Sequence, residues 1–465
     1  TVRKLLACAF GLAAAKGQAA PRVALAAPTG KAASRLRASL VGRDDPDDPL
    51  GKLDAHTIHR LLRRHPSNET RFRYGRDRRL PYDIVVVDEA SMIDLALMVK
   101  LVEAVADDAT LILLGDPDQL ASVEAGAVLG DLCGRRDGLL RMSSTFAQRL
   151  VPLMGEATPD RLKQRAQADE PSHGLGDGIF ELTKVFRFDA GGAIGQLAGL
   201  LQGSDDPREA LAFLGANERA IGSGGGLTWS QSHPQSDAAL RAHIVAAYRP
   251  AVEAALDAPR RVGEFDEASA TAAEAAHAEK VLAGFEALRV LCAHNRGPRG
   301  VENFDHLIRG WLAHAISNFH PAKDELGAGV PVLVTQNDAQ LGLYNGDVGV
   351  CIPHPSDPRR LRVAFAGEDG QIRFVSPTRL PAHKSVFAMS IHKSQGSQFD
   401  EVIVLLPEQP SPICTRELVY TAITRAKKGV GLIGSAAVLE SCLSKRVRRD
   451  SGLANALGQP AAKAD

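Results

Sequence analysis

Short, uninterrupted runs of aliphatic and β-branched residues that end abruptly in polar residues constrain the fold of this chain more than any other feature. The run Ile84–Val87 ends in Asp88 and Glu89, and the run 111–114 ends in the sequence GDPDQL, which contains Gln119. Such runs are typical of parallel strands buried on both faces. Because ligands bind at the carboxyl ends of strands in an open α/β sheet, we expect these polar residues to form one site.

The residue types at these strand ends suit phosphoryl transfer. Asp88 can hold Mg²⁺, while Glu89 can orient and deprotonate an attacking water. Gln119 is uncharged and can donate to a γ-phosphate oxygen while it accepts from water. The alternatives are an ordinary acidic strand-to-loop junction and a turn built by Gly115, Asp116 and Pro117.

A third strand is predicted at Val23–Ala27, where Pro28 and Gly30 end the apolar run and a helical pattern follows. A helix N-terminus at this point favours a bound anion. The sequence PTGK lacks the G-x-x-x-x-G-K-[ST] spacing of a nucleotide-binding loop. We therefore expect Thr29 and Lys31 to grip the phosphate backbone of DNA without reading its sequence.

No nucleotide-binding loop motif, or Walker A motif, occurs anywhere in the 465 residues. The segment Thr1–Leu6 reads as the first turns of a helix that starts without a capping residue before it. We therefore expect the nucleotide-binding loop to lie upstream of Thr1. On this interpretation, residues 1–465 alone bind ATP poorly.

The second half of the chain carries complementary pieces. The segment Val386–Leu406 predicts a strand, a polar loop whose donors suit phosphates, and a second strand. The segment Glu417–Gly434 predicts a helix that ends in Arg425, Lys427 and Lys428 and is followed by a short strand. Arg425 can stabilise charge in phosphoryl transfer, although the helix dipole alone also attracts basic residues to a helix C-terminus.

A chain of 465 residues exceeds what a single core usually supports, so several domains are expected. Closely spaced short strands over 330–381 predict a small barrel inserted in the second of two α/β lobes. The predicted order is a first lobe (1–202), a partly helical connector (203–285), a second lobe in two parts around the barrel (286–329 and 382–450), and a C-terminal tail (451–465).

Composition places limits on partners and compartment. The 55 Lys and Arg residues balance 55 Asp and Glu residues, so any track for nucleic acid must be local. Candidate basic clusters, which could equally be solvated faces, are 60–64, 71–79 and 445–449. The six scattered cysteines favour free thiols in a reducing cytoplasm over zinc or disulfides. No apolar stretch reaches the roughly 18 residues of a membrane helix.

Taken together, these segments resemble superfamily 1 helicases of the RecD kind, the alpha subunits of the helicase-nuclease exodeoxyribonuclease V, or RecBCD. The resemblance covers nearly the whole chain. Two features of the family, the nucleotide-binding loop and an amino-terminal domain, have no match here. The matching strings, in the family's order, are AAPTGKAASRL, HTIHRLL, VVDEASMIDL, LLGDPDQLASVEAGAVLGDLC, LTKVFRF, VLCAHNRGPRG, YNGDVGV, MSIHKSQGSQFDEV and YTAITRAKK.

The resemblance implies roles for matching residues. Asp88 would help hold Mg²⁺, Glu89 would be the general base, and Gln119 would sense the γ-phosphate. Arg187 and Arg425 would contact the transferred phosphate, one from each lobe, and Gly396 would contribute to nucleotide binding. Positions facing single-stranded DNA would be Thr29, Lys31, Thr57, His59, His392 and Ser394. Taken alone, His59 could be a half-buried surface histidine, and Arg187 could pair with a nearby acid.

The implied fold is two RecA-like P-loop NTPase lobes with an SH3-like β-barrel inserted in the second. The implied activity is an ATP- and Mg²⁺-dependent 5′–3′ DNA helicase of double-strand break repair. Its implied partners are DNA ends and the beta and gamma subunits of exodeoxyribonuclease V in the bacterial cytoplasm. No second acidic cluster suggests a nuclease centre. A stand-alone 5′–3′ helicase and a DNA-binding scaffold without ATPase activity stay open as alternatives.

Overall fold

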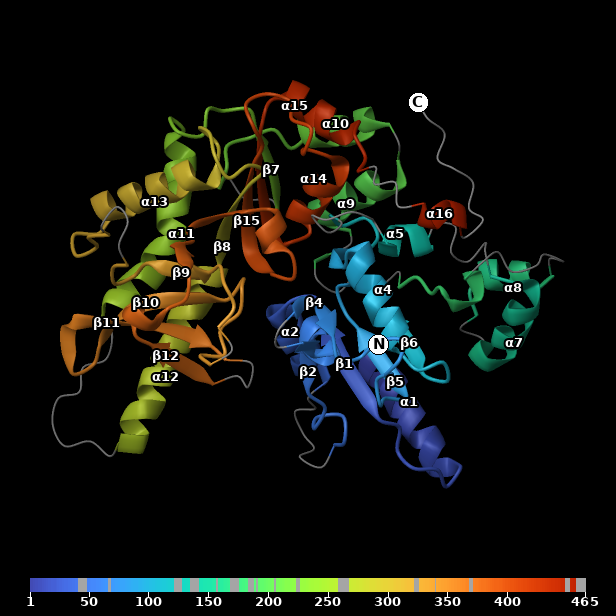
Figure 1. Cartoon of the computed structure of the whole chain (residues 1–465). Coiled ribbons are helices and arrows are strands. Elements are labelled where there is room, and N and C mark those ends of the chain that lie inside the picture. Colours follow the sequence, from blue (N-terminus) through green and yellow to red (C-terminus); the bar gives the residue numbers. More distant parts are fainter. Residues whose placement is uncertain are drawn as a thin grey trace.

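Two parallel sheets and one antiparallel sheet organise this chain, with a small two-stranded hairpin beside the first sheet (Figure 1). Helices cover both parallel sheets, so the architecture is the mixed α/β class predicted from the sequence. The computed structural model describes residues 1–40, 48–65, 68–120, 128–133, 142–155, 158–167, 175–182, 188–189, 191–204, 206–222, 226–257, 267–321, 326–338, 340–367, 371–447 and 452–456.

The first parallel sheet has the strand order β2-β1-β5-β6. The strands predicted at 23–27 and 84–87 are confirmed, and the strand predicted at 111–114 begins and ends one residue earlier. Because β1 and β6 both pair in parallel with β5, their carboxyl ends meet at one edge of the sheet. The strands are Val23–Ala27 (β1), Ala55–Thr57 (β2), Ile84–Val87 (β5) and Thr110–Leu113 (β6).

Alternate residues of β1 face different helix layers, as the pleat of a strand requires. Odd-numbered residues pack with α1 (Val2–Ala15) and α2 (Gly30–Leu40), and even-numbered residues pack with α3 (Ile58–Leu62) and α4 (Leu95–Ala104). Helices α7 and α8 project to one side (Figure 1). The other elements of this half are β3 (Arg64–His65), β4 (Asn68–Phe72), α5 (Val128–Cys133), α7 (Ser144–Met154) and α8 (Asp160–Gln167).

The second parallel sheet has the strand order β14-β8-β15-β16-β7. Its strands are β7 (Leu227–Ser230), β8 (Leu288–Cys292), β14 (Ala388–Ser390), β15 (Phe399–Leu405) and β16 (Ala426–Ile433). Along β15, even-numbered residues from 402 pack with α9, α10, α14 and α15, and odd-numbered residues from 403 pack with α11, α12 and α13. These helices are α9 (Ala193–Gly203), α10 (Pro207–Gly215), α11 (Ala238–Leu256), α12 (Glu267–Glu286), α13 (Val301–Ala315), α14 (Arg416–Ile423) and α15 (Ala436–Leu443).

The segment predicted as a connector is integrated into this second half. Residues 203–285 supply the edge strand β7 and helices on both faces of the second sheet. Helix α9, which precedes residue 203, packs in the same core as β15 and α14, although the predicted first lobe extends to residue 202. In the predicted tail, helix α16 (Leu453–Ala456) packs near α5 of the first half. The structure therefore joins to the second sheet two segments that sequence reasoning kept apart from it.

An antiparallel sheet is inserted between α13 and β14, within the range predicted for the barrel. Its strand order is β12-β11-β10-β9-β13, and it has a small core of its own. Among the described residues, β12 and β13 are edge strands, so closure into an SH3-like barrel stays a prediction. The strands are β9 (Pro331–Val334), β10 (Val348–His354), β11 (Asp357–Ala366), β12 (Ile372–Val375) and β13 (His383–Ser385).

The inserted sheet is fixed to the second half by a buried ion pair. The guanidinium of Arg362 on β11 lies 2.8 Å from the carboxylate of Glu274 on α12, and it also lies over the ring of Phe374. Both charged residues are buried, so each compensates the desolvation of the other.

In the part of the chain that the structure describes, no helix is both long and apolar enough to span a membrane.

Candidate nucleotide and DNA site

The carboxylates predicted to act on nucleotide lie at the carboxyl end of β5. Glu89 adopts φ 52°, in the left-handed region that non-glycine residues rarely occupy. The Asp88 carboxylate accepts the Glu89 backbone N–H at 2.9 Å, and the Ala90 N–H donates to the Leu114 carbonyl at 2.8 Å. These bonds hold a backbone conformation that costs about 1–3 kcal/mol and that is often found at functional sites.

The loop after β6 lies directly against this turn. A Cβ built at Gly115 would lie 2.6 Å from a methyl carbon of Leu129 and 3.1 Å from the backbone nitrogens of Ala90 and Ser91. Because two of these atoms belong to backbone, the neighbours cannot easily move. Glycine at position 115 is therefore required for the two polar loops to lie side by side.

Gly115→Ala is expected to lower the free energy of unfolding by about 1–3 kcal/mol, the usual cost of overpacking. Urea or thermal unfolding measures this change. The matched control is Gly199→Ala within α9, where no described atom lies within 4 Å of the added Cβ. That variant should be as stable as the original or more stable, because alanine favours a helix. Equal stability of the two variants would contradict the close approach at Gly115.

Gln119 and Arg425, predicted to act from opposite lobes, contact each other. The Arg425 Nη2 donates to Gln119 Oε1 at 2.7 Å, and Gln119 Nε2 donates to Asp116 Oδ2 at 3.2 Å. Gln119 is 8% exposed and Arg425 is 1% exposed. The structure thus brings a strand end of the first sheet against the turn before β16 of the second sheet.

The sequence predicts a helix that continues through Arg425, Lys427 and Lys428, and this prediction is wrong. Helix α14 ends at Ile423, and β16 begins at Ala426. Thr424 Oγ1 donates to carbonyls of the last turn, and pairing with β15 starts at Ala426. The two lysines instead form ion pairs with Asp400, and Arg425 Nε turns back to donate to the Thr421 carbonyl at 3.1 Å.

Leu120 anchors the β6 loop to the second half, a role that sequence reasoning missed. Its side chain is 3% exposed and packs in the core formed by α9, α14 and β15. Its backbone N–H donates to Thr421 Oγ1 at 2.8 Å, and its carbonyl accepts from Gln395 Nε2 at 2.6 Å. An apolar residue directly after the glutamine of GDPDQL was the available sequence signal.

The loop at 392–398 contacts the turn predicted to bind DNA. Gly396 has φ 69°, and a Cβ there would lie 3.9 Å from the Cβ of Ala32 and 4.0 Å from Thr29 Oγ1. Arg35 of α2 donates to the Gly396 carbonyl. The nucleotide role predicted for Gly396 stays a prediction, whereas its contact with the DNA-facing turn is a feature that the sequence did not indicate.

The predicted DNA-facing residues differ in their exposure. Ser394 is fully buried and its hydroxyl donates to the Ile391 carbonyl at 2.7 Å, so a direct contact with DNA disagrees with its burial. His392 and His59 are half-buried, and the His59 ring lies 5.8 Å from that of Phe72. Thr57 is half-buried as well, and its hydroxyl caps α3 by accepting from Arg60 N.

The turn that starts α2 carries two of the residues predicted to face DNA, Thr29 and Lys31. Thr29 Oγ1 accepts the Ala32 N–H at 3.2 Å, and the half-buried Lys31 follows Gly30 in the first turn of the helix. Burial, together with the nearby positive charge of Arg35, lowers the pKa of Lys31 to about 8. The ring of Tyr344, from the inserted sheet's β9–β10 loop, lies against Gly30.

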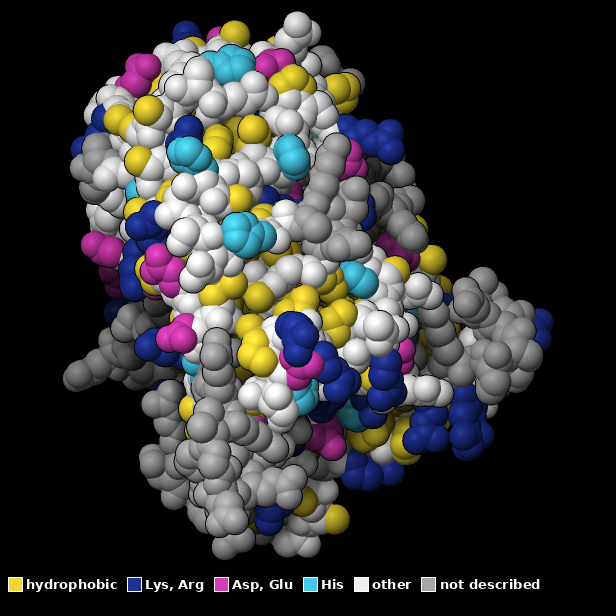
Figure 2. All heavy atoms as spheres, turned by 90° about the vertical axis from the view of Figure 1, so that its left-hand side faces the viewer, with side chains coloured by type: hydrophobic (Ala, Val, Ile, Leu, Met, Phe, Trp, Pro, Cys, Tyr) yellow, Lys and Arg dark blue, Asp and Glu magenta, His cyan; other side chains and the backbone are white. Residues whose placement is uncertain are grey.

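Charge is distributed locally on the surface, as expected for a chain with no net charge. Figure 2, which faces the left-hand side of Figure 1, shows Lys and Arg side chains gathered from the centre toward the lower right of the view. In the basic cluster predicted at 71–79, Arg76 and Arg79 form ion pairs with Glu103 and Asp107, so part of its charge is neutralised. Arg187 lies outside the described residues.

A magnesium site at this edge would rest on Asp88. Magnesium is usually held by one or two carboxylates together with phosphates and waters, so a single aspartate at a strand end fits. Within the described ranges, no group of three or more His, Cys, Asp or Glu side chains forms an all-protein metal site. The donor set therefore agrees with a cation that binds together with nucleotide.

Comparison with known proteins identifies relatives along the whole chain. The family model described as an AAA domain matches residues 4–125, and that of the UvrD-like helicase C-terminal domain matches residues 385–433. A crystal structure of the Pif1 helicase from Bacteroides in complex with ADP-AlF3 and ssDNA covers 91% of this chain and 90% of that chain, at 13% identity and a TM-score of 0.40, too low to carry a conclusion.

The RecBCD enzyme subunit RecD of Mycolicibacterium smegmatis is 38% identical over 459 residues, which cover 97% of this chain and 69% of the relative. The subunit of the same name from Mycobacterium tuberculosis is 39% identical over 458 residues, covering 97% and 67%. The ATP-dependent RecD2 DNA helicase of Deinococcus radiodurans is 28% identical and covers 91% of this chain but 44% of the relative. The chain therefore belongs to the family of the RecBCD enzyme subunit RecD.

Proposed function

We propose that this chain is the motor of an ATP-dependent 5′–3′ DNA helicase that works as the alpha subunit of a RecBCD-type enzyme in double-strand break repair. The observation that carries the proposal is the contact between Arg425 and Gln119. The contact joins two residues that phosphoryl transfer needs on opposite sides of a nucleotide. Gln119 lies on the loop after β6, which packs against the turn that contains Glu89. The name and extent of the mycobacterial relatives support the assignment to RecBCD.

In this mechanism, Glu89 takes a proton from the attacking water, Gln119 senses the γ-phosphate, and Arg425 stabilises charge on the transferred phosphoryl group. Mg²⁺ beside Asp88 would neutralise phosphate charge. Arg187 completes the proposed set from the first lobe. Because Gln119 and Arg425 come from different lobes, their exchange of partners during the cycle can change the contact between lobes and move the bound strand.

The proposed track for single-stranded DNA passes Thr29, Lys31, Thr57, His59 and His392. The loop at 392–398 lies against α2, so one strand could contact both lobes there. Partners in the proposal are DNA ends and the beta and gamma subunits. ATP hydrolysis is measured in a protein in which residues 1–465 follow a nucleotide-binding loop. Stimulation by single-stranded DNA and unwinding of substrates with a 5′ tail are expected; unwinding of 3′-tailed substrates alone would contradict the proposed direction.

The two alternatives predict different results. A stand-alone helicase, the alternative to which the RecD2 match corresponds, unwinds DNA without the other two subunits and does not bind them. A DNA-binding scaffold binds single-stranded DNA but shows no DNA-stimulated hydrolysis. The lower identity and coverage of the RecD2 match make the RecBCD assignment the stronger one.

The proposed role of Lys31 predicts a pH dependence. Because its pKa is lowered to about 8, the ammonium is charged below pH 8 and neutral above it. Affinity for single-stranded DNA is therefore expected to fall as the pH rises from about 7 to 9. Fluorescence anisotropy with a short oligonucleotide measures this change without nucleotide.

Two substitutions serve as controls for this pH dependence. Lys31→Arg keeps its positive charge at pH 7 and at pH 9, because the guanidinium does not titrate in this range. This variant should bind single-stranded DNA equally well at both pH values. Lys31→Gln should bind more weakly at pH 7 and show no further loss at pH 9. An unchanged pH profile in the glutamine variant would place the titrating group elsewhere.

A further inference from the structure

A chain of hydrogen bonds continues from Gln119 into the second half of the molecule. Asp116 Oδ2 accepts from Gln119 Nε2 at 3.2 Å and from the Tyr420 hydroxyl at 2.9 Å. The Tyr420 oxygen accepts from Gln202 Nε2 at 2.6 Å. Gln202 Nε2 also lies 3.3 Å from Asp118 Oδ2. Gln202 is on α9 and Tyr420 is on α14, so side chains of two helices reach the loop that carries Gln119.

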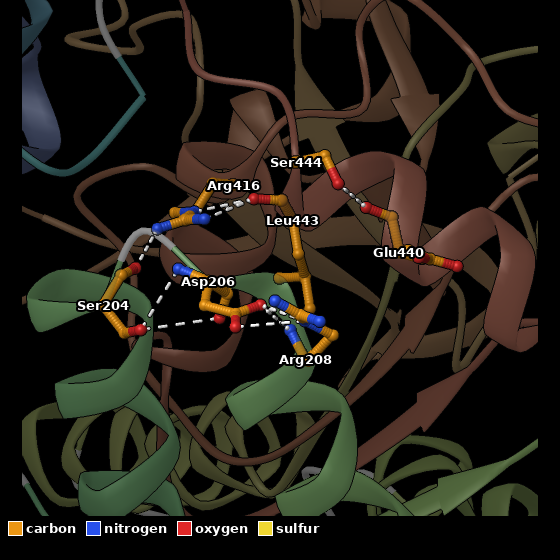
Figure 3. A network of polar contacts seen from close by, with 7 residues as sticks. All are labelled: Ser204, Asp206, Arg208, Arg416, Glu440, Leu443 and Ser444. Atoms are coloured by element: carbon orange, nitrogen blue, oxygen red, sulfur yellow. Dashed lines mark hydrogen bonds and ion pairs between the residues drawn. The ribbon is translucent and has the colours of Figure 1, made fainter.

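Helices α9 and α14 are fixed to each other next to this chain. Arg416, in the first turn of α14, donates from Nε to the Leu443 carbonyl at 2.8 Å and from Nη1 to the carbonyl of Ser204 (Figure 3). Arg416 is 5% exposed. Ser204 directly follows α9, so this buried guanidinium holds the end of α9 against the start of α14. Gln202 and Tyr420 therefore meet in a preorganised arrangement.

Both ends of the Gln119 amide are engaged in this structure. Its nitrogen donates to Asp116 and its oxygen accepts from Arg425. To donate to a γ-phosphate oxygen, the amide nitrogen must leave Asp116. Loss of this hydrogen bond would leave a carboxylate oxygen unsatisfied in a partly buried site, which costs free energy unless a second donor stays in place. The Tyr420 hydroxyl is such a donor, because it bonds to the same oxygen.

We propose that Tyr420, oriented by Gln202, is a positioning residue that keeps Asp116 satisfied when Gln119 exchanges it for the terminal phosphate of a nucleoside triphosphate. The inference rests on the proposed function and extends it to two residues that touch no nucleotide themselves. Tyr420 lowers the cost of releasing Gln119, and so it favours the triphosphate-bound state over the diphosphate-bound state. Gln202 makes that effect depend on the position of α9.

The test is the ratio of the affinity for a non-hydrolysable ATP analogue to the affinity for ADP, measured by titration calorimetry in a protein that supplies the nucleotide-binding loop. Tyr420→Phe keeps the ring and removes the hydroxyl. We expect it to weaken binding of the ATP analogue by about tenfold or more, the effect of one hydrogen bond to a charged group, and to leave ADP affinity unchanged. Gln202→Ala should act in the same direction with a smaller effect.

A double-mutant cycle separates positioning from structural damage. In a Gln119→Ala background, Tyr420→Phe should no longer change the ratio, because no amide has to leave Asp116. The matched control is Tyr248→Phe, which removes another buried hydroxyl that donates to a backbone carbonyl, that of Phe387. It should lower the melting temperature without changing the ratio.

The outcomes distinguish this inference from the proposed function. If the loop-containing protein without any of these substitutions binds neither nucleotide, or if Gln119→Ala leaves the ratio unchanged, the proposed function of the site fails. If Gln119→Ala lowers the ratio and Tyr420→Phe does not, the site stands and the positioning role is overturned. Equal weakening of ADP and the ATP analogue by Tyr420→Phe would also overturn it, because that result indicates general damage to the loop.

Discussion

Glu89→Gln is expected to lower the rate of DNA-stimulated ATP hydrolysis by about 10²- to 10⁴-fold, the usual contribution of a general base, while nucleotide binding persists. Glutamine keeps the size of the side chain and cannot accept the proton of the attacking water. Steady-state hydrolysis and nucleotide titration, in a protein that supplies the nucleotide-binding loop, measure the two quantities separately.

The control for this variant is Glu103→Gln on α4, where the carboxylate forms exposed ion pairs with Arg76 and Lys100. Exposed pairs contribute little, so that variant should hydrolyse ATP at the original rate. Rapid hydrolysis by the Glu89 variant would transfer the role of the base to another residue. Because Glu89 occupies a left-handed conformation, unfolding should also be measured, so that a loss of folded protein is not mistaken for a loss of catalysis.

Arg425→Lys and Arg425→Ala are both expected to lower DNA-stimulated turnover by about 10³-fold or more, the lower range for an arginine that stabilises a transferred phosphoryl group. Lysine should not substitute, because guanidinium presents a planar fork to two oxygens and ammonium is a point charge on a flexible stem. Affinity for single-stranded DNA without nucleotide should stay nearly unchanged, which an oligonucleotide titration checks.

Burial makes a stability control necessary for Arg425. Arg289→Lys replaces another fully buried arginine of the second half, whose described hydrogen bonds go to the carbonyls of Val386 and Phe285. We expect it to lower the melting temperature while turnover at saturating DNA stays at the original level. If Arg425→Ala instead abolished DNA binding and left turnover intact, Arg425 would belong to the DNA track and the site between lobes would be wrong.

Local pattern was sufficient to predict the elements that carry the site. The strands at 23–27 and 84–87 were predicted because an uninterrupted apolar run is buried on both faces wherever it lies in a parallel sheet. The polar residues that follow them had to share an edge, because parallel strands align their carboxyl ends. The inserted strands at 330–381 were predicted for the same local reason, since turn residues punctuate short β-prone runs.

Segment ends and assignments were less accessible from the sequence. The sequence AITRAKK has no helix-breaking residue, so the end of α14 at Ile423 depends on the Thr424 hydroxyl and on pairing with β15. The burial of Ser394 likewise depends on packing around its turn. The segment 203–285 reads as a connector because β7 is a single short strand, and only pairing with β16 places it in the second sheet.

By itself, then, the sequence determined which residues end the strands and which chemistry their side chains can perform, because strand formation and side-chain type are local properties. Only the tertiary structure decided which of those residues meet. The bond between Arg425 and Gln119, the burial of Leu120 in the second core, and the reach of Tyr420 to Asp116 join residues about 300 positions apart in the chain. No periodicity in the sequence encodes such pairs, because they depend on how two different sheets and their helices pack against each other.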